Sequence, residues 1–296
     1  MLHRRQVKSV LNRHKKRDSW FLDDYSVNPY EGCSCNCLYC YIRGSKYGLN
    51  MDNGLAVKVN ALEILDKQLA ARAKRNQYGI VTVGSATDAY IYHEQRLRMT
   101  EGMLKLLLKH RFPVFISTKC TLITRDIELV KKIDQAAILP HNLQDTLKRG
   151  VILCVSISTL DEKITNTLEP GATSPLQRLQ LVKRLKEEGF LVGINAIPVL
   201  PFISDTDQEL EKIISAAKEC HADYILVGGL TLFGNGIADN KTLFFRFLER
   251  YDASLIPKCQ QLYASNSYAA FSYQNELKEK VQRLCKKYSI RNSILE

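Results

Sequence analysis

The sequence predicts an α/β fold in which helices cover a parallel sheet. The chain has 296 residues, of which 45% are apolar, and this is enough to build a sizeable core. Short apolar, β-branched runs alternate along the chain with longer segments in which apolar residues recur every three or four positions. Each short run is continuously apolar, and such strands are typical of parallel sheets that are buried on both faces.

Six strands and five intervening helices are expected in order. Residues 79–83, Gly-Ile-Val-Thr-Val, are short and β-branched, as suits a buried strand. Gly189 follows one helical segment at its C-terminal cap position. The strands are expected at residues 25–30, 79–83, 113–118, 151–157, 190–197 and 223–231. The helices are expected at residues 61–75, 94–110, 126–137, 174–188 and 207–220, with further helices from about residue 240.

Residues 1–20 are expected to form a basic N-terminal arm. Its first 17 residues carry seven Lys or Arg side chains and no acid, and without them the formal charge of +11 falls to +4. Such a segment either contacts a polyanion such as nucleic acid or is a solvated arm or helix on the domain surface, and we favour the second interpretation. Residues 21–235 are expected to form the core barrel, and residues 236–296 a helical extension packed on it.

A cytoplasmic protein without membrane spans is expected. The longest nearly apolar stretch, residues 190–203, is too short to cross a bilayer and contains Asn195, Pro198 and Pro201. The basic N-terminus is not followed by the apolar segment of a signal peptide.

Four of the nine cysteines fall within Cys33-Ser-Cys-Asn-Cys-Leu-Tyr-Cys40, which indicates a metal site in a chain without a secretion signal. Cys33, Cys37 and Cys40 have the spacing C-x3-C-x2-C, with which one loop can wrap an iron–sulfur cluster. Three thiolates bind three irons of a four-iron cluster and leave the fourth open. Cys35 is interpreted as a bystander. Structural zinc is the alternative, although the sequence has no second C-x-x-C or paired His to complete a zinc site.

The cysteine loop, with Tyr39 before its last cysteine, resembles that of the radical S-adenosylmethionine (SAM) superfamily. The longer string Asn28-Pro-Tyr-Glu-Gly-Cys-Ser-Cys-Asn-Cys-Leu-Tyr-Cys-Tyr41 resembles the branch related to spore photoproduct lyase, the DNA repair photolyase-like proteins. Residues 8–12, 84–90, 118–119, 125–126, 156–161, 169–171, 178 and 198–201 also fit this branch. The resemblance covers about residues 7–235 and implies a partial (β/α)6 TIM-like barrel with outer helices, to which this chain adds C-terminal helices.

The resemblance also implies an activity. A 4Fe-4S cluster would reductively cleave SAM to a 5′-deoxyadenosyl radical, which would abstract hydrogen from a substrate that the sequence does not identify. A flavodoxin or ferredoxin-like electron donor is implied, and the basic charge leaves a nucleic acid or another acidic substrate open. Ligands of parallel α/β folds bind at the C-terminal ends of the strands. The residues assigned to SAM in this way are Tyr39, Ser85, Lys119, Ser156, Ser158 and Pro198.

One departure from the branch concerns hydrogen donation. Spore photoproduct lyase uses a cysteine beyond its second strand, but residues 84–88 of this chain, Gly-Ser-Ala-Thr-Asp, contain no thiol. Thymine-dimer repair is therefore not expected. Cys120 and Cys154 are possible substitutes, although Cys154 is better explained as a small core residue. Tyr90, beyond the second strand, is a further catalytic candidate.

Two rival functions remain open. One is a zinc-binding module that contacts nucleic acid, which zinc rather than iron and sulfide in the purified protein would support. The other is a degenerate scaffold that binds a cluster and turns over nothing, which an absence of 5′-deoxyadenosine would support.

Overall fold

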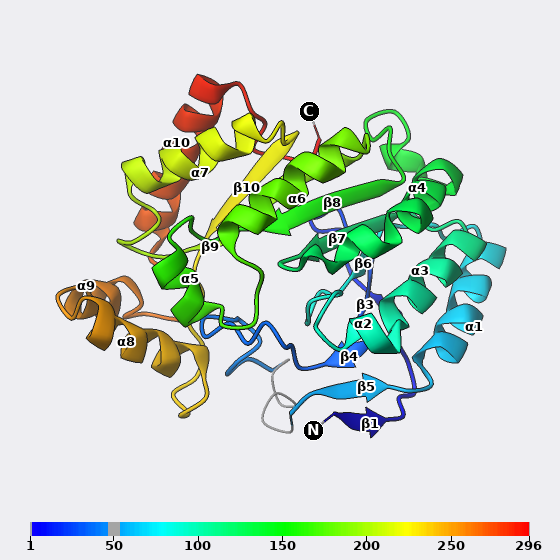
Figure 1. Cartoon of the computed structure of the whole chain (residues 1–296), viewed down its shortest axis with the longest axis horizontal. Coiled ribbons are helices and arrows are strands. Elements are labelled where there is room, and N and C mark those ends of the chain that lie inside the picture. Colours follow the sequence, from blue (N-terminus) through cyan, green and yellow to red (C-terminus); the bar gives the residue numbers. More distant parts are fainter. Residues whose placement is uncertain (1, 47–53, 296) are drawn as a thin grey trace.

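The computed structural model describes residues 2–46 and 54–295, and its centre is a partial barrel of parallel strands with helices outside it (Figure 1). The main sheet has seven strands in the order β10-β9-β8-β7-β6-β3-β2. All neighbouring strands from β10 to β3 are parallel, which confirms the predicted α/β fold and its six strands. These strands are Tyr25–Val27 (β3), Val81–Val83 (β6), Val114–Thr118 (β7), Val151–Ser156 (β8), Leu191–Val199 (β9) and Tyr224–Gly229 (β10).

Six helices share the main apolar core with the strands. In each strand one set of alternate residues, such as Val114 and Ile116 of β7, packs with apolar helix residues in this core. The opposite set contributes to a second cluster in which Phe115 and Cys154 pack with Tyr224. The helices are Ala61–Lys74 (α1), Met99–Lys109 (α3), Ile127–Ala136 (α4), Pro175–Glu187 (α6), Asp207–Glu219 (α7) and Phe271–Tyr288 (α10).

One expected helix is two helices in the structure. Residues 94–110 form Glu94–Leu97 (α2) and α3, because Arg98 between them has a left-handed φ of 51°. The buried Glu94 carboxylate accepts hydrogen bonds from the backbone N–H groups of Thr100 (3.0 Å) and Glu101 (3.3 Å). Glu94 therefore satisfies the free amides at the start of α3 from outside that helix, and the periodicity of the sequence does not show such a cap.

The basic N-terminal segment lies on the surface as short extended pieces, and its described residues form no helix. His3–Arg5 (β1) pairs in parallel with Ala56–Lys58 (β5), which pairs with Tyr30–Glu31 (β4) in a separate three-stranded sheet. Asn12–Arg13 (β2) runs antiparallel to β3 at the edge of the main sheet. Strands β1 and β2 are only two or three residues long and exposed, so they lack the apolar runs that indicate a buried strand. The domain boundaries at residues 20 and 235 stay a prediction.

The C-terminal helices bring distant parts of the chain together. Asn240–Tyr251 (α8) and Leu255–Leu262 (α9) share an apolar cluster with the cysteine loop and with Glu162–Leu168 (α5), a short helix that the sequence analysis missed. The helices expected from about residue 240 are confirmed. Within the described part of the chain, no helix combines the length and the apolar character needed to cross a membrane.

Candidate functional site

The cysteine loop follows β4 and is built from tight turns. Asn36 lies in the left-handed region with φ 51°, which asparagine tolerates better than most residues. Its N–H donates to the Cys33 carbonyl (3.3 Å), and the Cys40 N–H donates to the Cys37 carbonyl (3.3 Å). The Leu38 N–H donates to the carbonyl of Leu168 at the end of α5 (2.8 Å), which fixes the loop to that helix.

The three predicted cluster ligands are shielded thiols. Cys37 is buried, and Cys33 and Cys40 are partly buried. Burial raises the pKa of Cys37 and of Cys40, and a hydrogen bond with Cys35, followed by burial, raises the pKa of Cys33. Thiols in such surroundings become thiolates when a positive charge, such as that of iron, is placed beside them. The donor set therefore fits an iron–sulfur cluster.

Only one set of metal-ligating side chains among the described residues is close enough for a single ion, and it is not the predicted trio. The ligand atoms of Cys35, Asp88 and Cys120 lie within 4.8 Å of one another. In a tetrahedral zinc site the sulfur atoms are about 3.8 Å apart, given the usual zinc–sulfur distance. Cys33, Cys37 and Cys40 do not form such a set in the described part of the chain.

Cys35 and Cys120 meet although 85 positions separate them. Their Sγ atoms are 3.6 Å apart, and Cys120 lies just beyond the end of β7. Asp88 beside them is already held in place, because its carboxylate accepts from Thr118 Oγ1 (2.7 Å) and from the Lys119 N–H (2.7 Å). The structure thus brings one catalytic candidate, Cys120, to the cysteine loop. The bystander role of Cys35 stays a prediction.

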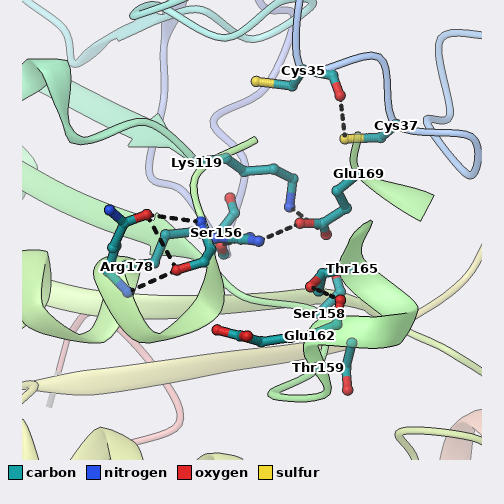
Figure 2. A network of polar contacts seen from close by, with 12 residues as sticks. Cys35, Cys37, Lys119, Ser156, Ser158, Thr159, Glu162, Thr165, Glu169 and Arg178 are labelled. Atoms are coloured by element: carbon teal, nitrogen blue, oxygen red, sulfur yellow. Dashed lines mark hydrogen bonds and ion pairs between the residues drawn. The ribbon is translucent and has the colours of Figure 1, made fainter. Parts of the chain in front are cut away.

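A buried carboxylate, Glu169, organises the other side of the loop (Figure 2). Arg178 donates to Glu169 Oε2 (2.5 Å), and the Lys119 ammonium lies 3.2 Å from Glu169 Oε1. The Tyr39 hydroxyl donates to the same carboxylate and shares a 2.8 Å hydrogen bond with Ser158. Burial raises the pKa of Glu169, but the charges of Lys119 and Arg178 outweigh burial and lower it to about 2.

Lys119 retains unused hydrogen-bonding capacity. Its side chain is 13% exposed, and its ammonium lies 5.7 Å from the centre of the Tyr39 ring. Despite the short distance to Glu169, no oxygen of the described residues accepts a well-directed hydrogen bond from the ammonium. A buried ammonium that keeps free donors beside the cysteine loop fits the carboxylate of SAM.

The remaining predicted residues differ in how near they lie to this network. Ser85 contacts the loop region, because its carbonyl accepts from Tyr41 Oη (2.7 Å). The Ser156 hydroxyl instead pairs with Ser117 Oγ at 3.1 Å, while the Ser156 carbonyl accepts from Arg178. Pro198 follows a cis peptide bond near the end of β9. Tyr90 is buried in the main apolar core that the strands share with the helices.

Sequence reasoning missed the central part played by Glu169 and Arg178. Both residues lie in stretches that fit the family branch, but neither was assigned a role. Glu169 lies between the strand expected at 151–157 and the helix expected at 174–188, whereas Arg178 lies within that expected helix. Their pairing nevertheless depends on the fold, because Glu169 follows α5 and Arg178 lies in the first turns of α6.

The structure thus combines a partial barrel of parallel strands with a cysteine loop beside a buried network of charged side chains. A family model described as the radical SAM superfamily matches residues 27–217. The chain belongs to the radical SAM superfamily and is a radical SAM enzyme.

The chain is also similar to further proteins in sequence and to solved structures in fold. An uncharacterized protein of Mycobacterium tuberculosis (strain H37Rv) is 28% identical over 272 residues, which cover 90% of this chain and 75% of the relative. Spore photoproduct lyase complexed with dinucleoside spore photoproduct has a TM-score of 0.65 at 14% identity, covering 97% of this chain and 79% of that chain. A variant of that enzyme with bound AdoMet and dinucleoside spore photoproduct has a TM-score of 0.63 at 14% identity, covering 94% and 78%. At this identity the likeness concerns the fold.

Proposed function

We propose that Cys33, Cys37 and Cys40 hold a 4Fe-4S cluster with one open iron and that SAM binds beside it. When bound, the cluster and SAM supply a 5′-deoxyadenosyl radical through one-electron reductive cleavage of SAM. The observation that carries this proposal is the Lys119 ammonium, buried beside the three-cysteine loop with donors to spare. The same side chain lowers the pKa of Cys37, but burial has the larger effect on that thiol.

The residues of this chain would bind and orient the ligands. Lys119 would neutralise the carboxylate of SAM, as charge-assisted hydrogen bonds do. Glu169 and Ser158 hold the hydroxyl of Tyr39, so the ring keeps one orientation next to the cluster ligands. Apolar residues of α5 and α8 pack around Cys37 and exclude water from this side of the loop. Radical chemistry depends on such positioning and exclusion, because the cofactor supplies the reactivity itself.

For the substrate we propose a nucleic acid or a nucleotide. The charge of +11 supports an anionic substrate, and solved proteins of the same fold bind a dinucleoside. Cys120 is the candidate for hydrogen return, since it is the described cysteine from outside the loop that contacts the loop thiols. We also propose a cytoplasmic location, where a reducing environment keeps such thiols available.

Anaerobic reconstitution with iron and sulfide tests the proposal. The reduced protein, incubated with SAM and dithionite, should release 5′-deoxyadenosine and show cluster absorbance. Colourless protein with one zinc ion per chain would instead support the zinc-binding alternative. A bound cluster without any 5′-deoxyadenosine would support the degenerate scaffold.

Lys119→Met tests the ligand site through binding rather than turnover. Loss of a charge-assisted hydrogen bond costs about 1.5–3 kcal/mol, so SAM affinity should fall roughly 10- to 100-fold while iron content stays unchanged. Lys163→Met, at an exposed position of α5, is the matched control. Equal SAM affinity in the two variants, measured by equilibrium dialysis, would contradict the role of Lys119.

A further inference from the structure

A groove lies between the small N-terminal sheet and α2, on the surface next to the cysteine loop. Its volume is about 760 Å³, and its lining includes Leu2, Arg4, Val57, Tyr92, Arg96 and Leu97. Figure 1 shows this small sheet and α2 at the same end of the molecule as the N-terminus. We call this feature the N-terminal groove.

The pairing of β1 with β5 explains which residues line the N-terminal groove. Arg4 lies opposite Val57 in the parallel register, and both line the groove, so this face of the small sheet turns toward α2. Arg5 and Lys58 are one position further along and therefore point to the opposite face. On that face Arg5 pairs with Glu31 at 2.6 Å.

Arg4 and Arg96, the two arginines that line the N-terminal groove, are exposed, and their charges are not neutralised by a described acidic side chain. Among the described residues, no acid forms an ion pair with Arg4 or Arg96. Their neighbours differ, because Arg5 pairs with Glu31 and Arg98 pairs with Glu101. The groove therefore combines an apolar floor with a rim of unneutralised positive charge, which suits an acidic protein partner.

The floor of the N-terminal groove reaches the cysteine loop directly. Leu2, Val57 and Leu97 line the groove and belong to the apolar cluster against which Cys33 packs. Tyr92, which is 77% exposed, donates its backbone N–H to Ser34 Oγ at 3.0 Å, and Ser34 is the residue after Cys33 in the chain. A partner bound in the N-terminal groove would thus contact residues that themselves pack against the apolar cluster containing Cys33, one of the proposed iron ligands.

We propose that the N-terminal groove docks an acidic one-electron carrier protein of the flavodoxin type. This inference rests on the proposed function: an electron from the carrier would enter the cluster that Cys33 would help to hold, and it would be consumed in the reductive cleavage of one SAM. The position beside Cys33 favours an electron donor over a nucleic acid. Two arginines around an apolar floor are also few for a nucleic-acid site, which commonly makes six or more phosphate contacts.

The first readout is binding, and it does not require a loaded cluster. Purified oxidised flavodoxin is titrated into the full chain by isothermal titration calorimetry at low salt. Arg4→Glu/Arg96→Glu should weaken binding about tenfold or more, because reversed rim charges repel an acidic partner. Arg246→Glu/Arg250→Glu, at exposed positions of α8, is the matched control and should bind like the unmodified chain.

The second readout compares two reductants of the reconstituted enzyme. With reduced flavodoxin, the groove variant should form 5′-deoxyadenosine about tenfold more slowly, and added salt should slow the unmodified enzyme toward the same rate. With dithionite, both proteins should react equally, which also shows that the variant is folded. Should the double variant lose the dithionite reaction too, Arg96→Glu alone replaces it, since Arg96 is exposed in a short surface helix.

The outcomes separate the two proposals. No dithionite-driven product from the unmodified enzyme would overturn the proposed function. Normal dithionite activity together with unchanged flavodoxin binding and rate in the groove variant would overturn the docking site alone. Weaker binding of duplex DNA by the groove variant, with flavodoxin binding unchanged, would likewise overturn it and assign the groove to nucleic acid.

Discussion

At the scale of single residues, Glu169 connects the parts of the site. It is 3% exposed and receives Arg178 on one carboxylate oxygen and Lys119 with Tyr39 on the other. An unpaired charge at this depth would be strongly destabilising, so the two cations are needed to keep the carboxylate ionised. The same contacts hold the side chain of Tyr39, a residue of the cysteine loop, so the geometry of the proposed ligand site depends on this one ion-pair network.

The ion-pair network around Glu169 makes the free energy of unfolding depend on pH in the acidic range. The pKa of Glu169 lies near 2 in the folded chain and near 4.5 in the unfolded chain. A lowered folded-state pKa adds stability that is fully present above about pH 4.5 and is lost as the pH falls toward 2. Urea unfolding at pH 6 and pH 3 should show this loss, and Glu169→Gln should show a smaller one. Glu249→Gln, at an exposed position of α8, should behave like the unmodified chain, and an equal acid sensitivity in both variants would refute the assignment.

The cysteines provide a second comparison between single residues. Cys37→Ala should abolish cluster retention, because it removes one of three proposed ligands. Cys35→Ala should keep the cluster, since the Cys35 sulfur contacts Cys120 and not iron in our assignment. Iron and sulfide per chain, with the absorbance of anaerobic samples, are the measurements. If both variants lose the cluster equally, the ligand register must include Cys35.

At the scale of elements, the segment between α5 and α6 ties the cysteine loop to the barrel. The Gly171 N–H donates to the Cys35 carbonyl (3.1 Å), and the Thr173 N–H donates to the Lys119 carbonyl (3.3 Å). The segment between α5 and α6 therefore fixes the position of the cysteine loop relative to the end of β7. It passes so close that a Cβ on Gly171 would lie 1.9 Å from the Ser34 carbonyl oxygen.

Gly171→Ala should displace the cysteine loop. A contact this short with backbone cannot be relieved by a side-chain rotation, so the loop or the connection must move. Cluster content should fall while the far-ultraviolet circular dichroism stays that of the unmodified chain. Gly189→Ala is the control, because it strains a left-handed residue (φ 84°) at the end of α6 with open space around it. Its expected cost of about 1 kcal/mol should appear in unfolding but not in cluster content.

The strength of sequence prediction differed among the elements. The six parallel strands were predictable because each is a continuous apolar run, and α6 because Ser174 caps its start and Gly189 follows its end. The short helix α5 was missed, since its seven residues span too few turns for periodicity to show. Strand β1 was missed because its three residues are exposed and show no apolar pattern, and β5 because three residues are too few for a pattern to show.

The site was predictable only where its residues are local. The C-x3-C-x2-C spacing and Lys119 at a strand end are visible in the sequence, whereas the Cys35–Cys120 contact spans 85 positions. Glu169 and Arg178 meet because two helices and a loop fold back on one another, and no short motif records that approach.

At the scale of the whole molecule, the C-terminal helices complete the enclosure of the site. Phe244 and Leu248 of α8 share an apolar cluster with Cys37 and Tyr39, about 200 positions earlier. The Asn240 side-chain amide also donates to the Tyr39 carbonyl (3.1 Å). Residues after 235 therefore form one wall around the cysteine loop, in addition to packing on the barrel.

Phe244→Ala tests this wall. Truncation of a fully buried phenylalanine costs about 3–5 kcal/mol, and here the resulting cavity would open beside the cysteine loop. The bound cluster should therefore be lost faster to an iron chelator. Phe112→Ala removes an equally buried ring from the main core and should reduce stability to a similar degree without faster loss of iron. Identical rates of iron loss would show that the C-terminal helices do not protect the cluster.

The shared cluster of α8 and the cysteine loop also constrains biosynthesis. A ribosome releases Cys33, Cys37 and Cys40 early, but Glu169, Arg178 and finally Phe244 must emerge before the loop is enclosed. A nascent chain would thus expose its thiols to solvent through most of translation. Iron delivery to this protein is therefore expected to follow synthesis of the chain through α8, which makes cluster assembly a late maturation step.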